Sequence, residues 1–155
     1  MAVSLSDIQE FLGLKQIAIV GVSRKNGAYS RTVFDNLRCA MPHVIPVNPE
    51  VDEIEGEQCF RSVSDIYPPP QGAILLVHAG AILGVTRECL RTGVKMVWMR
   101  QAGSTSEAHS QAAEECRTAG VKLIEGECPL MFLRGGHWIH HVHASMRKLV
   151  GTYPA

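Results

Sequence analysis

The chain has 155 residues, which is enough for one domain with a hydrophobic core that needs no metal or disulfide support. Charged residues make up 19% and the net charge is +0, so no summed basic field favours nucleic acid or a membrane surface as a partner. No apolar stretch reaches the length of a membrane span, and we expect no secretory signal. The five cysteines are odd in number and scattered, which predicts reduced thiols in a cytoplasm.

The first half of the chain predicts two helices and two strands. Ser6 or Asp7 is a candidate cap for a helix over residues 6–12. The apolar run "QIAIVGV" (16–22) is typical of a strand buried on both faces of a parallel sheet. Ser30 is a candidate cap for the next helix, whose apolar residues follow helical spacing. "HVIPVNP" (43–49) predicts a second strand that Pro49 ends.

The second half predicts three more strands. Residues 50–72 are irregular, with a one-turn helix at about 62–66, and "GAILLVHAG" (72–80) predicts the third strand. Two similar units, 88–99 and 113–126, each run from a helix end through a glycine into a strand. Gly93 and Gly120 stand where left-handed helix caps belong, and Ser104 and Glu107 have capping-box spacing. A final helix is predicted over residues 137–150.

This alternation of strands and helices predicts a single Rossmann-like α/β domain over residues 1–155, with its core at 15–133. The three layers would be a doubly wound, mainly parallel sheet between two layers of helices, joined by right-handed crossovers. Ligands of such sheets bind beyond the carboxyl ends of the strands. Four segments are expected there: 21–31, 47–49, 78–82 and 99–104.

The turn after the first strand resembles a phosphate-binding turn with a changed pattern. Nicotinamide and flavin sites use G-x-G-x-x-G, whereas Gly21 is followed here only by Gly27. Two serines and the start of the next helix would face an anion. The cations of this segment are Arg24, Lys25 and Arg31. They favour a ligand with more phosphate than a simple dinucleotide, although a solvated basic loop explains them equally well.

The end of the second strand supports the same interpretation. A nicotinamide site usually carries an acid there that binds the ribose hydroxyls, whereas this strand ends in Asn48 and Pro49. A carboxylate would repel a ribose with a phosphate on its 3′-oxygen, and an asparagine does not. The missing acid therefore favours a nucleotide with an extra phosphate.

The segments "IAIVGVS", "YSRTVFDNL", "VIPVNP", "IEGEQCFRSVSDI", "VKMVWM" and "CP", in this order, resemble the small stand-alone CoA-binding proteins. These proteins are similar to the CoA-binding domain of the succinyl-CoA synthetase α subunit. The resemblance covers about residues 12–133 and implies a Rossmann fold that holds coenzyme A or acyl-CoA. The chain departs from it at "VHAGAI" (77–82), where family members often have a polar or basic pair. The residues predicted to bind the cofactor are Gly21, Val22, Ser23, Arg24, Lys25, Ser30, Arg31, Val47, Asn48, Pro49, His78, Ala79 and Cys128.

Cys128 and the histidine-rich segment each allow a second interpretation. Cys128 precedes Pro129 at a predicted helix start, which lowers a thiol pKa and would permit a mixed disulfide with CoA. A buried structural cysteine is the alternative. His137 and His141 are i, i+4 neighbours that could share a metal, but no acid lies between them as in the H-E-x-x-H signature. We expect ordinary histidines and no metal.

No catalytic motif is present: the chain has no G-x-S-x-G elbow, no Walker A sequence and no paired carboxylates with a matched base. We therefore expect non-catalytic binding of CoA or acyl-CoA by a sensor, carrier or regulatory protein. The alternatives are an NAD(P)- or sugar-nucleotide-dependent enzyme and, as the weakest, a metal-dependent hydrolase. The sequence is compatible with a homo-oligomer and with an acyl-CoA enzyme as partner.

Overall fold

The computed structural model describes residues 3–100 and 106–133. Five parallel strands form one sheet in the order β2-β1-β5-β6-β7. The strands are β1 (Gln16–Val20), β2 (His43–Val47), β5 (Gly72–Leu75), β6 (Met96–Met99) and β7 (Lys122–Glu125). The predicted doubly wound α/β fold is therefore confirmed. The predicted helix at 137–150 lies outside the described residues.

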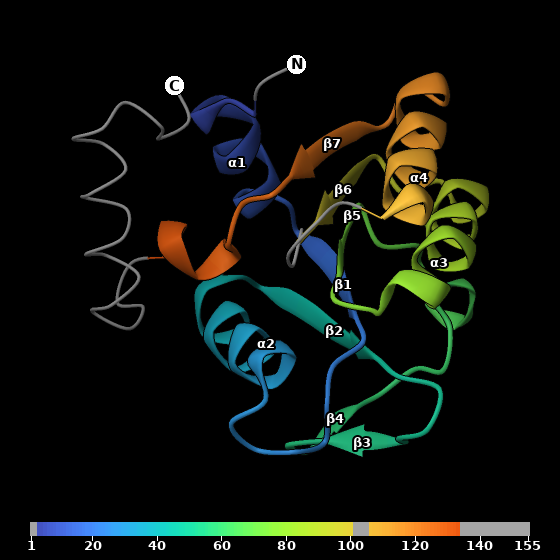
Figure 1. Cartoon of the computed structure of the whole chain (residues 1–155). Coiled ribbons are helices and arrows are strands. Elements are labelled where there is room, and N and C mark those ends of the chain that lie inside the picture. Colours follow the sequence, from blue (N-terminus) through green and yellow to red (C-terminus); the bar gives the residue numbers. More distant parts are fainter. Residues whose placement is uncertain (1–2, 101–105, 134–155) are drawn as a thin grey trace.

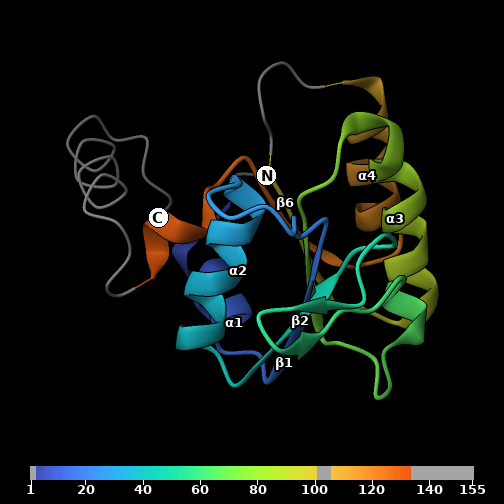
Figure 2. The same cartoon turned by 90° about the horizontal axis from the view of Figure 1, so that it is seen from below.

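Helices cover both faces of this sheet (Figures 1 and 2). Helices α1 (Leu5–Leu12) and α2 (Tyr29–Ala40) lie on one face, and α3 (Ala79–Thr92) and α4 (Glu107–Thr118) lie on the other. Strand β1 shows why the sheet is buried on both sides, because Ile17 and Ile19 belong to one core cluster and Ala18 and Val20 to the other. This alternation gives the predicted apolar run its two buried faces.

Short elements connect the sheet to its helices. A hairpin of β3 (Glu53–Ile54) and β4 (Glu57–Gln58), which the sequence did not predict, follows β2. A 3₁₀ helix, η1 (Val63–Asp65), confirms the predicted one-turn helix, and a second, η2 (Pro129–Phe132), follows β7. The third predicted strand is shorter than expected, since β5 ends at Leu75. No helix in the described ranges is long and apolar enough to cross a membrane.

The predicted N-terminal caps are wrong at three helices. Helix α1 is capped by Ser4, whose Oγ accepts the N–H of Asp7 at 3.1 Å. Helix α2 starts after Ala28, which makes no side-chain cap, so Ser30 lies inside the first turn. Helix α4 is capped by Ser106, two residues after the predicted Ser104.

The predicted left-handed glycines at the C-terminal ends of α3 and α4 are confirmed. Gly93 ends α3 with a φ of 83°, and Gly120 follows the end of α4 with a φ of 71°. Both values lie in the left-handed region that terminates helices.

Candidate functional site

The sheet has its topological switch point between β1 and β5. The chain leaves β1 toward α2 on one face and leaves β5 toward α3 on the other, so a crevice opens between the two strand ends. A cavity of about 280 Å³ lies at this end of the sheet, between the start of α2 and the segments that follow β5 and β6. It is lined by Tyr29, Ser30, Leu76, Val77 and Arg100. The predicted location of the site, beyond the carboxyl ends of the strands, thus contains a cavity.

Gly21 makes the turn that opens this crevice. Its φ is +94°, and a Cβ placed on it would stand 2.5 Å from the carbonyl oxygen of Leu76. Its N–H donates to the carbonyl of Val47 at 2.9 Å, and the Leu76 N–H donates to the carbonyl of Val20 at 2.9 Å, so both neighbours of β1 are bonded to the chain at this turn. A glycine is required here because any side chain would collide with the end of β5.

Hydrogen bonds within the loop that follows Gly21 fix its shape. The Ser23 N–H donates to Ser30 Oγ at 3.0 Å, and the Lys25 N–H donates to Ser23 Oγ at 3.1 Å. Val22 is fully buried, whereas the side chains of Arg24 and Lys25 are exposed. The two serines therefore support the loop, and the two cations remain accessible to an anion.

Two helices begin beside the crevice without a side-chain cap. Helix α2 starts after Ala28 and α3 starts after His78, and neither residue accepts a hydrogen bond from the first turn with its side chain. Helices α1 and α4, by contrast, are capped by serines. Uncapped N–H groups at the positive end of a helix are suited to bind a phosphate. His78 and Ala79 are exposed at the start of α3.

Tyr29, Arg100 and Cys128 form a cluster at this site that includes two residues the sequence did not single out. The guanidinium carbon of Arg100 lies 3.9 Å from the centre of the Tyr29 ring, and the Tyr29 hydroxyl lies 3.2 Å from Cys128 Sγ. Burial and the contact with Cys128 raise the pKa of the Tyr29 hydroxyl. Cys128 precedes η2, which starts at Pro129 as predicted, and the mixed disulfide stays a prediction. The position of Arg100, directly after β6, is the signal that could have found it.

Arg100 is the cation most directly presented to the cavity. No carboxylate within residues 3–100 and 106–133 pairs with it. The remainder of the sequence contains neither aspartate nor glutamate. Its charge is held over an aromatic ring, an arrangement that orients a guanidinium without neutralising it.

Asn48 connects the end of β2 to the loop after β1. Its Nδ2 donates to the carbonyl of Val22 at 2.8 Å, and its Oδ1 accepts the N–H of Glu50 at 2.8 Å. The amide therefore holds the loop in place, and the predicted contact of Asn48 with the cofactor stays a prediction. Val47 is buried at the strand end, and Pro49 is exposed.

Arg31 points into the protein, away from the role the sequence suggested. Its side chain is buried, with Nε donating to Asp35 at 3.1 Å and Nη2 paired with Glu55. Its Nη1 donates to the carbonyl of Arg24 at 3.4 Å. The predicted contact with a ligand phosphate would require these bonds to break.

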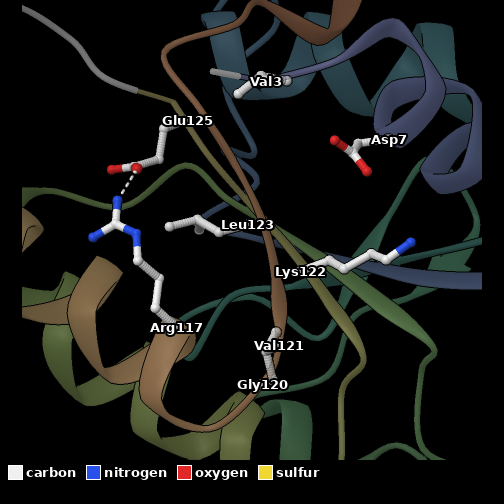
Figure 3. A pocket seen from close by; sticks show the side chains of 8 residues that line it. All are labelled: Val3, Asp7, Arg117, Gly120, Val121, Lys122, Leu123 and Glu125. Atoms are coloured by element: carbon white, nitrogen blue, oxygen red, sulfur yellow. Dashed lines mark hydrogen bonds and ion pairs between the residues drawn. The ribbon is translucent and has the colours of Figure 1, made fainter. Parts of the chain in front are cut away.

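A larger pocket of about 530 Å³ runs along the free edge of β7 (Figure 3). Its charged groups serve the structure: Arg117 pairs with Glu125 at 2.6 Å, and Lys122 pairs with Glu10 of α1. Among the described residues, no three histidine, cysteine, aspartate or glutamate side chains are placed to hold a metal ion. His137 and His141 lie outside that part of the chain.

The parallel sheet, the glycine turn and the uncapped helix ends define a three-layer α/β domain of the nucleotide-binding type. The chain belongs to the CoA binding domain family, whose model matches residues 15–134. The resemblance to small CoA-binding proteins is therefore confirmed.

Relatives of two sizes are similar to this chain. The uncharacterized protein YneT of Bacillus subtilis is 31% identical over 77% of this chain and 90% of its own length. An ADP-forming acetate–CoA ligase of Methanocaldococcus jannaschii is 28% identical over 74% of this chain, which spans only 17% of that ligase. A hypothetical protein from Pyrococcus horikoshii is similar in structure, with a TM-score of 0.73, 28% identity and coverage of 82% of this chain and 87% of its own.

Proposed function

We propose that this chain binds coenzyme A or acyl-CoA in the crevice between β1 and β5. The observation that carries the proposal is that Arg100 and the uncapped start of α2 line one cavity. The uncapped helix α3 begins two residues after the lining residue Val77, and Leu76, which also lines the cavity, borders the glycine turn. Membership of the CoA binding domain family supports the same ligand. The phosphates would meet the N–H groups of α2 and α3, with Arg24 and Lys25 at the mouth of the crevice.

We further propose that the chain binds its ligand without turning it over, as a sensor, carrier or regulatory protein. The cavity offers a guanidinium, a serine hydroxyl and backbone N–H groups, all of which suit the binding of anions. The acetate–CoA ligases that it resembles are much longer, and the chain covers less than a fifth of each of the first two. Ligase activity is a property of those longer proteins, and for this chain we propose CoA binding alone.

The test is a calorimetric titration of the protein with CoA, NAD and ATP. We expect CoA to bind more tightly than NAD, because the loop carries cations and the end of β2 carries no acid for a ribose. Arg100→Gln should lower the affinity for CoA by about tenfold, since it removes one charge-assisted hydrogen bond. Arg91→Gln is the matched control, because Arg91 is exposed in the last turn of α3, which leads into the amino end of β6 and not into the carboxyl ends of the strands.

Two results would contradict the proposal. Tighter binding of NAD than of CoA would favour the dinucleotide enzyme, and an equal effect of both arginine variants would remove Arg100 from the site. Mass analysis of any small molecule released on denaturation gives an independent check, since it identifies a ligand that survives purification.

A further inference from the structure

Arg31 joins three parts of the chain: helix α2, the β3–β4 hairpin and the loop that follows Gly21. It is only 4% exposed, although arginine is rarely buried without partners. Its guanidinium contacts Asp35 on its own helix, Glu55 at the tip of the β3–β4 hairpin and the carbonyl of Arg24 in the loop. The Nε atom and both terminal nitrogens of the side chain are thus already engaged within the protein.

The hairpin that carries Glu55 is fixed at both ends. At its base, the N–H of Asn48 donates to the carbonyl of Phe60 at 2.9 Å, which ties the returning chain to the end of β2. At its tip, Glu55 has a φ of 51°, the left-handed region in which a side chain is unfavourable. Arg38 of α2 donates to the Glu55 carbonyl at 3.5 Å, beside the Arg31 pair. Figure 1 shows the hairpin next to the loop that connects β1 with α2.

We infer that Arg31 is a positioning residue: Glu55 fixes its guanidinium, the guanidinium holds the loop over residues 22–28 through the Arg24 carbonyl, and Arg31 does not itself contact a ligand phosphate. This inference rests on the proposed function. A ligand phosphate would have to displace a carboxylate from a buried guanidinium, whereas Arg24 and Lys25 present their charges without such a rearrangement. A loop that is ordered before binding raises affinity because less entropy is lost on association.

The experiment compares Arg31→Met, Glu55→Gln and the double variant with the natural protein. Amide exchange of Ser23 and Lys25 is measured without ligand, because both N–H groups are bonded only when the loop is in place. We expect exchange at both amides to rise by about tenfold in each single variant. CoA affinity should fall by a similar factor in each, with no further loss in the double variant.

Glu115→Gln is the matched control, since it removes a carboxylate from Arg87 between α3 and α4 on the opposite face. It should change neither loop exchange nor CoA affinity. If Arg31 bound phosphate directly, Glu55→Gln would free the charge of Arg31 and make CoA binding tighter. That result would overturn the inference. If the natural protein binds no CoA, the proposed function fails, while unchanged exchange in Arg31→Met would separately refute the positioning role.

Discussion

At the residue scale, Gly21 is the position where a single methyl group should do the most damage. Gly21→Ala places a Cβ 2.5 Å from the carbonyl oxygen of Leu76 and forces an alanine to adopt a φ of +94°. We expect the free energy of unfolding to fall by about 2 kcal/mol or more, since strain and collision add. CoA affinity should also fall, because the turn shapes the crevice. Urea denaturation and calorimetric titration measure the two effects.

Gly27→Ala is the control for this substitution. Gly27 also has a positive φ, of +81°, but a Cβ there would have no heavy atom within 4 Å. It should lose only the conformational part, about 1 kcal/mol. Equal losses in the two variants would show that the contact with Leu76 does not constrain the turn.

Single residues also show where sequence reasoning stops. The role of Gly21 was predictable, because a glycine between a buried strand and a polar loop is typical of a phosphate-binding turn. The burial of Arg31 was not, since its partner Glu55 lies 24 residues away on a hairpin too short to leave a periodic pattern. Arg100 was missed because the cavity that gives it a role is built from three separate segments.

At the element scale, the junction between α3 and η1 depends on one carboxylate. Glu88 of α3 accepts hydrogen bonds from the Ser62 hydroxyl and from the Ser64 N–H, the latter at 3.0 Å. Partial burial raises the pKa of Glu88, but these hydrogen bonds outweigh it, so the pKa lies below its usual value. The carboxylate form is therefore favoured in the folded state.

Glu88→Gln should lower the free energy of unfolding by about 1 kcal/mol near neutral pH, because one charged acceptor is lost. Its effect should shrink as the pH falls through the Glu88 pKa, since protonation removes the same interaction from the natural protein. Thermal unfolding between pH 3 and pH 7 measures both. Glu114→Gln, at an exposed pair with Arg117, is the control. A pH-independent difference would contradict the assignment.

Helix boundaries were less predictable than the strands for a physical reason. Serines occur at several positions near the helix starts, among them Ser4 before α1 and Ser6 inside its first turn. Which serine becomes the cap depends on which turn brings Ile8 and Phe11 into the core, and the sequence alone does not show that packing. The strands, by contrast, are continuous apolar runs whose burial on both faces leaves little choice.

At the scale of the whole molecule, the two faces of the sheet have different cores. The face under α1 and α2 packs large side chains, including Phe11, Phe34 and Trp98, and the Trp98 ring meets Phe11 edge-on at 5.3 Å. The face under α3 and α4 packs smaller ones, among them Ala112, Cys89 and Cys116. The parallel topology was predictable from the alternation of elements, but this division between the faces was not.

The buried thiols between α3 and α4 make the stability of the fold sensitive to alkaline pH. Burial raises the pKa of Cys89 from 9.0 to about 12 and that of Cys116 to about 11. In the unfolded chain both thiols ionise above about pH 9, whereas the folded protein keeps them protonated. The unfolded state therefore binds fewer protons across this range, and stability must fall as the pH rises from 9 toward 12.

The size of this dependence can be measured on one thiol. Because Cys89 loses its proton in the unfolded chain but keeps it in the folded protein, the free energy of unfolding should fall by up to about 1.4 kcal/mol per pH unit. Cys89→Ala lowers stability at neutral pH because the smaller side chain leaves a cavity. Between pH 9 and pH 11, however, the free energy of unfolding of this variant should fall less steeply than that of the natural protein. Cys39→Ala, at an exposed thiol of α2, should leave the slope unchanged. Urea unfolding at several pH values gives these slopes, and parallel curves for the natural protein and Cys89→Ala would show that the buried thiol does not control alkaline stability.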